Sequence, residues 1–291
     1  MRKTVLSLVS VAALALAGCN GSPSSDQAGN GAPAPSDSTA AVQVPSEVSG
    51  TISLRAGSPP PSDKATLVLN LSDVSSSAAG SAPLATQTTP AGTFPQPFKL
   101  TFNPASVKSN DLYVVQAILT DGDRHYRMPI QAPVLAKGSK NEGVSIELVA
   151  EQTPSEKLLA AFKAEQEQLG AMKVSHGTKL EKDESRGWQL FRHDGEVQFI
   201  RELVEYTKAG FTSTDYAYKD GKPWAVVQQT KPSRDGQPTA IDRAGWTDDG
   251  TLVLKQHQVG SDVQPLDADA AAKLKQEAVD ILNLATNGKN K

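Results

Sequence analysis

The sequence contains one cysteine, Cys19, and only four histidines in 291 residues. A single thiol excludes an intramolecular disulfide and a redox or zinc site built from paired cysteines. The histidines, His125, His176, His193 and His257, are scattered, and none has a second ligand at metal-binding spacing. We therefore expect no metal, no cofactor and a fold that is stable without cross-links.

Sequence signatures of catalysis are also missing. The chain has no Gly-x-Ser-x-Gly elbow, no His-Glu-x-x-His and no phosphate-binding glycine loop. His193 next to Asp194 is a conceivable base, but a histidine at the end of a strand is the simpler interpretation. We predict a protein that is not an enzyme.

Charge of one sign is not concentrated anywhere. The chain has 29 basic and 32 acidic residues, and no long basic cluster occurs. Because nucleic-acid binding depends on clustered Lys and Arg that neutralise phosphates, we expect no nucleic-acid partner.

No apolar run reaches the ~20 residues that a membrane-spanning helix needs. The uncharged run from Val5 to Ala17 follows Arg2 and Lys3. A basic start and a short apolar segment are typical of a secretory signal peptide, which we place at residues 1–18.

The end of this run, Leu16-Ala17-Gly18-Cys19, resembles the lipobox of bacterial lipoproteins. The resemblance implies cleavage after Gly18 and acylation of Cys19, which would attach the protein to a membrane. Asn20 replaces the aspartate of an inner-membrane retention signal, which implies the outer membrane, facing the periplasm. The alternative is an ordinary signal peptide with a chance cysteine.

Residues 20–45 contain no Lys, no Arg and no aromatic side chain, and Gly, Ser, Pro and Ala dominate. Such a segment cannot bury enough apolar surface to offset the loss of chain entropy. We interpret residues 19–45 as a lipidated, disordered tether.

Residues 46–153 show short runs in which apolar and polar residues alternate. The expected strands lie at 48–54, 65–71, 84–89, 98–102, 112–119, 125–128 and 144–148. About seven short strands separated by Pro and Gly turns over ~100 residues predict an all-β, antiparallel sandwich.

Two motifs in this segment are specific: ATLVLNLSDVS at 65–75, and Pro97 and Phe98 followed by Phe102 and Pro104. With them, residues 48–149 resemble the lipoprotein family named for YbaY and YscW. Its members are described as type III secretion lipoprotein chaperones, or pilotins. The resemblance implies an immunoglobulin-like sandwich and a chaperone-like role toward envelope proteins. A long Ser/Ala stretch at 75–82 and the further domain depart from the family pattern.

Residues 154–291 form the expected second domain. Thr153, Pro154 and Glu156 predict the start of a helix that ends at Gly170, and a last helix is expected from Asp267. Between them, Asp-Gly pairs at 194–195, 220–221 and 249–250 predict hairpins. We expect an α+β domain in which an antiparallel meander carries both helices on one face.

Most of the large aromatic residues lie in this second domain, among them Trp188, Trp224 and Trp246. The simpler interpretation is that they fill its core. The alternative is a groove that binds an envelope glycan or a small ligand, and exposure of the rings distinguishes the two.

Two functional hypotheses follow. The first is a non-catalytic accessory factor for envelope proteins, which binds a partner by adding its strand to an exposed edge of the sandwich. The second is recognition of an envelope glycan or small ligand by the aromatic second domain.

Overall fold

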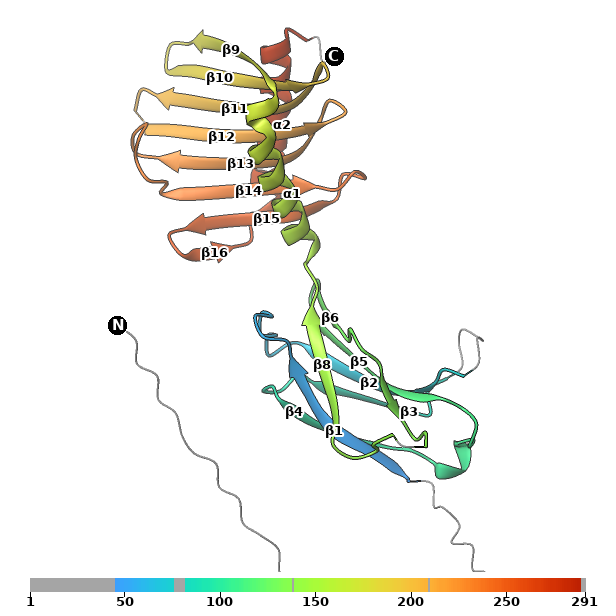
Figure 1. The fold of residues 1–291 in the computed structure, drawn as a ribbon. Helices are drawn as coiled ribbons and strands as arrows, with labels where there is room; N and C mark the ends of the chain where they lie inside the picture. The colour runs from blue at the N-terminus through green and yellow to red at the C-terminus, as the bar shows by residue number, and fades with distance from the viewer. Residues whose placement is uncertain (1–44, 76–81, 138, 209, 289–291) are drawn as a thin grey trace, which may run out of the picture. The chain divides into compact units, whose positions relative to one another are not determined.

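The computed structural model describes residues 45–75, 82–137, 139–208 and 210–288. The predicted signal peptide, Cys19 and the predicted tether up to residue 44 lie outside these ranges. Within them, no helix is long and apolar enough to cross a membrane. The described residues are rich in β-structure and form two sheets and two α-helices (Figure 1).

The first sheet contains eight strands in the spatial order β3-β2-β5-β6-β8-β1-β4, and β7 also pairs with β5. Their bounds are β1 (Glu47–Leu54), β2 (Thr66–Asp73), β3 (Ala85–Pro90), β4 (Gln96–Thr101), β5 (Tyr113–Asp121), β6 (Arg124–Arg127), β7 (Ala132–Val134) and β8 (Val144–Ala150). A short 3₁₀ helix, η1 (Pro104–Ser106), follows β4. The predicted sandwich-like, β-rich fold is confirmed.

Alternation explains why these residues form strands with one buried face. In β2, Leu67, Leu69 and Leu71 are buried, whereas the residues between them are partly exposed. In β4, Phe98 and Leu100 face the same core. Side chains of a strand point alternately to its two faces, so burial of every second residue closes the apolar core.

Two features of the first sheet differ from the prediction. β1 and β8 pair in parallel, whereas the sequence predicted an antiparallel arrangement throughout. β7 was not predicted, because a three-residue strand with Pro133 at its centre gives no alternation to detect. The finer immunoglobulin-like assignment stays a prediction.

The second sheet is an antiparallel meander in which each strand pairs with its neighbours in sequence, from β9 to β16. The strands are β9 (Lys173–Leu180), β10 (Glu184–His193), β11 (Glu196–Tyr206), β12 (Gly210–Lys219), β13 (Lys222–Lys231), β14 (Ala240–Trp246), β15 (Leu252–Val259) and β16 (Asp262–Gln264). The helices are α1 (Pro154–Gln168), continued by the 3₁₀ turn η2 (Leu169–Ala171), and α2 (Ala268–Thr286).

The predicted Asp-Gly turns join these strands. Asp194 and Gly195 have φ values of 49° and 91°, and Asp220 and Gly221 have values of 51° and 69°. Positive φ at both central residues matches the right-handed twist of the flanking strands. Gly250, with φ of 87°, ends the turn between β14 and β15.

Both helices begin where the sequence predicted. The Thr153 side chain accepts a hydrogen bond from the backbone N–H of Glu156, and the Glu156 carboxylate accepts one from the N–H of Thr153. Asp267 accepts from the N–H of Ala270 at the start of α2. These bonds satisfy N–H groups that a helix start leaves without a partner.

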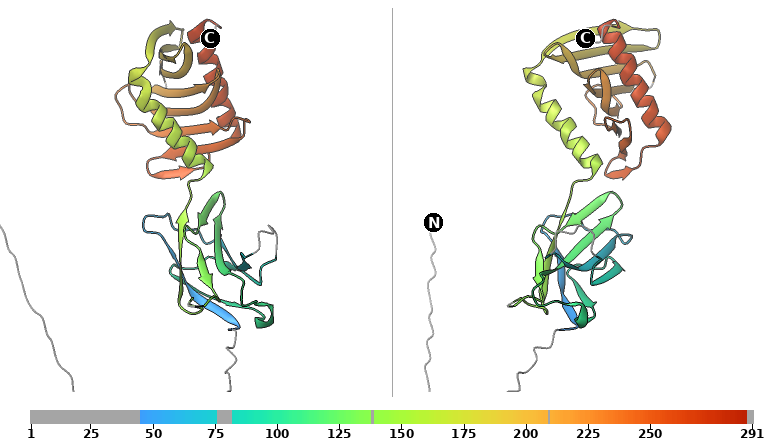
Figure 2. Two further views of the ribbon diagram at one scale, coloured as in Figure 1. Left: turned by 45° about the vertical axis from the view of Figure 1, so that its right-hand side comes forward. Right: turned by 90° about the vertical axis from the view of Figure 1, so that its right-hand side faces the viewer.

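The prediction that both helices lie on one face of the sheet was wrong. α1 packs its Phe162 against Phe199, and α2 packs Ile281 into the cluster around Tyr216. Figure 2 (right) shows the sheet between the two helices. The reason lies in the central strands: neighbouring residues such as Ala225 and Val226 are both buried, so both faces need a cover. The more specific assignment of the second domain to the α+β class stays a prediction.

Candidate functional site

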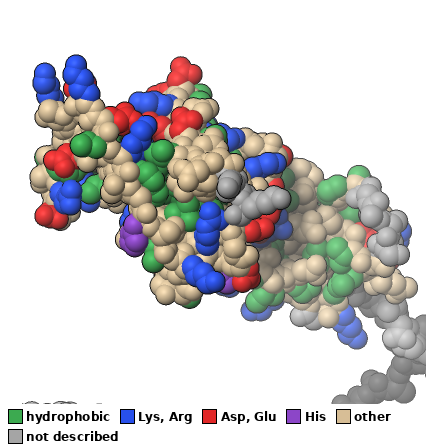
Figure 3. All heavy atoms as spheres, turned by 90° about the horizontal axis from the view of Figure 1, so that it is seen from above, with side chains coloured by type: hydrophobic (Ala, Val, Ile, Leu, Met, Phe, Trp, Pro, Cys, Tyr) green, Lys and Arg blue, Asp and Glu red, His purple; other side chains and the backbone are tan. Residues whose placement is uncertain are grey.

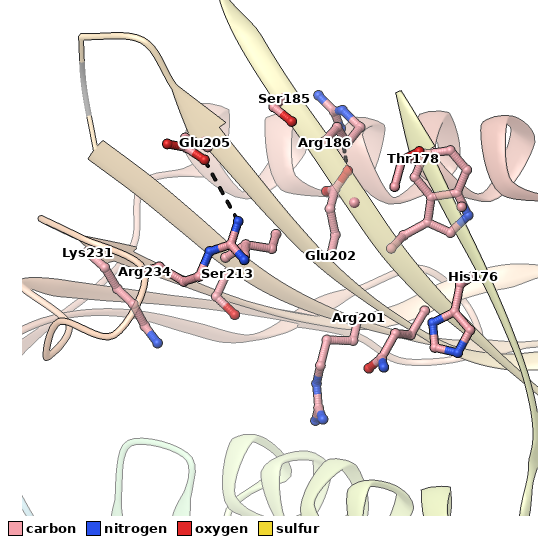
Figure 4. Close-up of a pocket in the computed structure, with 15 residues that line it drawn as sticks. His176, Thr178, Ser185, Arg186, Arg201, Glu202, Glu205, Ser213, Lys231 and Arg234 are labelled. Atoms are coloured by element: carbon pink, nitrogen blue, oxygen red, sulfur yellow. Dashed lines mark hydrogen bonds and ion pairs between the residues drawn. The ribbon is translucent and has the colours of Figure 1, made fainter. Parts of the chain in front are cut away.

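A groove of about 530 Å³ lies on the second sheet, on the face that carries α1. Phe191, Phe199 and Ala217 lie side by side on neighbouring strands, and α1 covers them. The groove is formed by residues of the same strands that lie next to this covered set. Its lining side chains come from β9 to β13 and the loop after β13: His176, Thr178, Ser185, Gln189, Arg201, Leu203, Glu205, Ser213, Lys231 and Arg234 (Figure 4).

Small residues make the groove deep. Gly187 and Ser213 both lie opposite Leu203 across the strands. A Cβ placed on Gly187 would meet no atom within 4 Å, so the space above this glycine is open. The floor is therefore backbone and short side chains, flanked by longer polar ones.

The wall nearest α1 is held by hydrogen bonds to Asp215. Arg201 donates from Nε to Asp215 Oδ1 over 2.9 Å, and Gln166 of α1 donates to Asp215 Oδ2 over 2.7 Å. The Asp215 hydrogen bond raises the pKa of Arg201. Arg201 is thus a fixed cation at the junction of helix and sheet.

The remaining charges of the groove are mostly positive. Lys231 and Arg234 lie on its rim with His176, and Glu205 is 3.8 Å from Arg234. This arrangement can hold a polar or anionic group. It places no nucleophile beside a base, and among the residues that the structure describes no cluster of His, Cys, Asp or Glu could bind a metal ion.

A buried ionic network lies on the opposite face, beneath α2. The side chain of Glu202 is 2% exposed, and it accepts hydrogen bonds from Arg186 and, over 2.7 Å, from the Tyr216 hydroxyl. Arg186 also donates to Glu184 over 2.9 Å. In Figure 4, Arg186 and Glu202 meet on one side of the sheet, while Arg201 extends to the other.

Burial raises the pKa of Glu202, and the hydrogen bonds from Tyr216 and Arg186 oppose that rise. Burial also raises the pKa of Tyr216, and the neighbouring Glu202 adds to the effect. Sequence analysis missed this network. The detectable signal was a glutamate between Ile200 and Val204 on the buried face of β11.

The three tryptophans do not form one site. Trp188 is half-buried, and its ring occupies the space above Gly177, where a Cβ would lie 2.2 Å from the ring. Trp246 is 6% exposed, and the Lys275 ammonium lies 4.9 Å from its ring centre. Trp224 is half-buried and packs edge-on against Phe162.

Two of these rings border one depression. Trp224 and Trp246 lie along a hollow of about 450 Å³, together with Lys222 and Lys275. Trp188 is not part of it, because it lies at the groove near β9.

Among the described strands, the first sheet ends at β3, which pairs with β2 alone, and at β4, which pairs with β1 alone. We consider the β3 edge. Ala91 donates a hydrogen bond to the Ala65 carbonyl over 2.8 Å. In an antiparallel pair, every second residue turns its backbone groups to the partner strand. The backbone groups of Thr86 and Thr88 therefore point away from β2.

A row of β-branched side chains leads from this edge across the face of the sheet that carries Thr88. Thr88 lies opposite Val68, and Val68 lies opposite Ile118, which is 46% exposed. Ile118 and Met128 line a hollow of about 480 Å³. On the same strand as Thr88, the Gln87 Oε1 atom is buried and lacks a hydrogen-bond partner within the described residues.

Comparison with known proteins finds a family match that covers the first sheet. Residues 43–148 match the family described as type III secretion system lipoprotein chaperone (YscW). The resemblance predicted from the sequence is confirmed for this segment. The chain is also similar, with 20% identity and a TM-score of 0.33, to the structure of an alternative pilotin from the type II secretion system of Vibrio cholerae. That likeness covers 36% of this chain and 96% of the other. No curated protein matches the chain.

Proposed function

We propose that the protein is a non-catalytic accessory factor, chaperone-like or pilotin-like, that binds an envelope protein through its first sheet. The observation that carries the proposal is the match of residues 43–148 to a family of lipoprotein chaperones. The lipobox-like sequence Leu16 to Cys19 supports a lipid anchor on the periplasmic side of the outer membrane. Acyl chains on Cys19 would place the first sheet near a membrane-bound partner.

The partner segment is an extended strand that pairs with β3. Thr86 and Thr88 offer outward-facing backbone groups for such pairing, which gives affinity without regard to sequence. The row from Thr88 to Ile118 would contact alternate apolar side chains of the partner. The buried oxygen of Gln87 would accept a hydrogen bond from a polar partner group.

Replacing Thr88 with proline is expected to reduce partner recovery at least tenfold, measured by in-cell crosslinking and mass spectrometry of the full chain. Proline removes the outward N–H but no bond to β2, so the sheet is retained. The control Thr88→Val keeps the N–H and should keep the partner. Equal recovery with Thr88→Pro and Thr88→Val would contradict pairing at β3, and recovery of background proteins alone from the unaltered chain would contradict the accessory role.

A second proposal is recognition of an acidic envelope glycan at the hollow bordered by Trp224 and Trp246. The observation that favours it is the combination of two indole rings with Lys222 and Lys275 in one hollow. The half-buried Trp224 ring would stack on a sugar ring, because Trp246 is 6% exposed and has Lys275 over its ring, and Lys222 would attract an acidic group.

Soluble peptidoglycan fragments are expected to change the tryptophan fluorescence of the full chain in a saturable way. The change should disappear in Trp224→Phe and persist in Trp188→Phe, because Trp188 does not border the hollow. A titration with no response, or one that is lost only in Trp188→Phe, contradicts glycan binding at this hollow.

A further inference from the structure

The edge strand β9 is exposed on both faces. Seven of its eight residues are exposed and Gly177 is half-buried. Val174 and Leu180, both apolar, are 48% and 84% exposed. Among the described strands, β9 pairs only with β10. A long edge strand without a cover is a template for pairing with another chain.

The register shows which backbone groups of β9 are available. Glu181 donates to the Glu184 carbonyl over 2.9 Å at the turn into β10. Since bonding alternates along an antiparallel pair, the residues in step with Glu181, such as Lys179 and Gly177, face β10. The backbone groups of Val174, His176, Thr178 and Leu180 therefore face outward.

We propose that two copies of this chain associate through β9, antiparallel, with the two-fold axis at Gly177. In this register Val174 lies opposite Leu180 of the second copy, so the two exposed apolar residues cover each other. Lys173 lies opposite Glu181 of the second copy, which pairs opposite charges at both ends. The four residues with outward-facing backbone groups lie opposite one another across the two copies. Every outward N–H and C=O group of β9 therefore has a hydrogen-bond partner in the second copy.

The next possible register is less favourable. With the axis at His176, Lys173 lies opposite Lys179 of the second copy at both ends of the interface. Like charges directly opposite each other destabilise a sheet. Val174 then lies opposite Thr178, and Leu180 lies opposite Met172, which precedes β9. The order Lys-Val-Ser-His-Gly-Thr-Lys-Leu-Glu is thus self-complementary about its glycine.

Gly177 and Trp188 fit the axis of this dimer. Because Gly177 turns its backbone groups toward β10, the two Gly177 residues on the axis would form a pair that shares no hydrogen bond. The Cα atoms of such a pair lie about 4.5 Å apart. Gly177 has no side chain there, and the Trp188 ring lies over it. The two Trp188 rings would flank the axis and lose exposure on association.

The surface at this end of the molecule also suits a second copy. Figure 3, seen from the end at which Figure 1 shows β9, has basic and acidic side chains interspersed and apolar side chains between them. A face of mixed charge does not repel an identical face. In a two-fold dimer, each β9 pairs with the other β9. No free β9 edge then remains to bind a third copy.

Paired cysteines test the register in the full chain with Cys19→Ser, so that introduced thiols are the only ones. Ser175 lies opposite Lys179 of the second copy in the proposed register, so Ser175→Cys with Lys179→Cys should give a disulfide-linked dimer under mild oxidation. Each single variant should form no disulfide-linked dimer, because its cysteine has no cysteine opposite it. Lys173→Cys with Lys179→Cys should link at least tenfold more slowly. Faster linking of this second pair, or no linking of the first, would overturn the proposal.

Charge reversal gives an independent readout by sedimentation of the full chain in detergent. Lys173→Glu should weaken the dimer about tenfold, because it places two acidic residues opposite each other at each end. Adding Glu181→Lys should restore it. A chain that sediments as a monomer throughout, or a double variant as weak as the single one, would show that β9 is not paired with a second copy.

Discussion

Replacing Arg186 with alanine is expected to lower the free energy of unfolding at pH 7 by about 3–5 kcal/mol, because it leaves a buried carboxylate without its cation. Glu202 is 2% exposed, and its carboxylate accepts hydrogen bonds from Arg186 and Tyr216 in the folded chain. Tyr216 can donate one hydrogen bond but carries no charge. The measurement is urea unfolding of the full chain.

The control is Arg55→Ala, which removes an arginine from an exposed ion pair. Arg55 and Glu147 are 2.7 Å apart, with exposed fractions of 50% and 47%. Exposed pairs contribute about 0–1 kcal/mol, so this variant should unfold close to the unaltered chain. Equal losses of unfolding free energy in Arg55→Ala and Arg186→Ala would contradict the claim that burial of Glu202 makes its ion pair important.

The loss in Arg186→Ala should shrink at acidic pH. Burial already raises the folded-state pKa of Glu202 above its usual 4.5, and the Arg186 hydrogen bond and charge lower it. Without Arg186 the folded pKa rises further, so the folded chain holds the proton more strongly than the unfolded chain. Stability then falls as the pH rises through 4.5 toward the folded pKa. At pH 4 the carboxyl is mostly neutral in both states, and the variant should regain part of its stability.

Replacing Cys19 with serine is expected to move the protein from the membrane fraction to the soluble fraction almost completely. Each buried acyl methylene contributes about 0.8 kcal/mol, and stable anchoring needs more than one chain. Serine cannot carry the thioether that lipobox processing forms, so the variant loses every acyl chain. Fractionation after a carbonate wash measures the change, and the mass of the N-terminal peptide reports acylation.

The matched variant Asn20→Asp keeps Cys19 and would therefore keep the proposed acyl chains. It should stay in the membrane fraction but shift from the outer to the inner membrane, because aspartate after the cysteine resembles a retention signal. A Cys19→Ser protein that remains with the membrane after the wash would show that something other than the lipid holds it there.

Local sequence patterns were sufficient to predict strands with one buried face, helix starts and hairpin turns. Alternating leucines predicted β2, the capping box at Thr153 predicted the start of α1, and Asp-Gly pairs predicted the turns of the second sheet. Each of these features depends on residues that are neighbours in sequence. The motifs within residues 48–149 likewise indicated the segment that matches the YscW family.

β9 escaped prediction for the opposite reason. Lys173 to Leu180 are exposed on both faces, so burial imposes no alternation on their sequence. β16 is three exposed residues long, too short for any period. Both are strands only because a neighbouring strand supplies the hydrogen bonds.

By itself, the sequence determined the β-rich composition of the fold, most of its strands, both helix starts and the resemblance of the first sheet to the YscW family. Only the tertiary structure decided that α1 and α2 cover opposite faces, that Glu202 is buried against Arg186, and that a groove opens beside β9. The physical reason is that periodicity shows that a face is buried but not which distant element covers it. That choice is made by contacts between residues far apart in the chain.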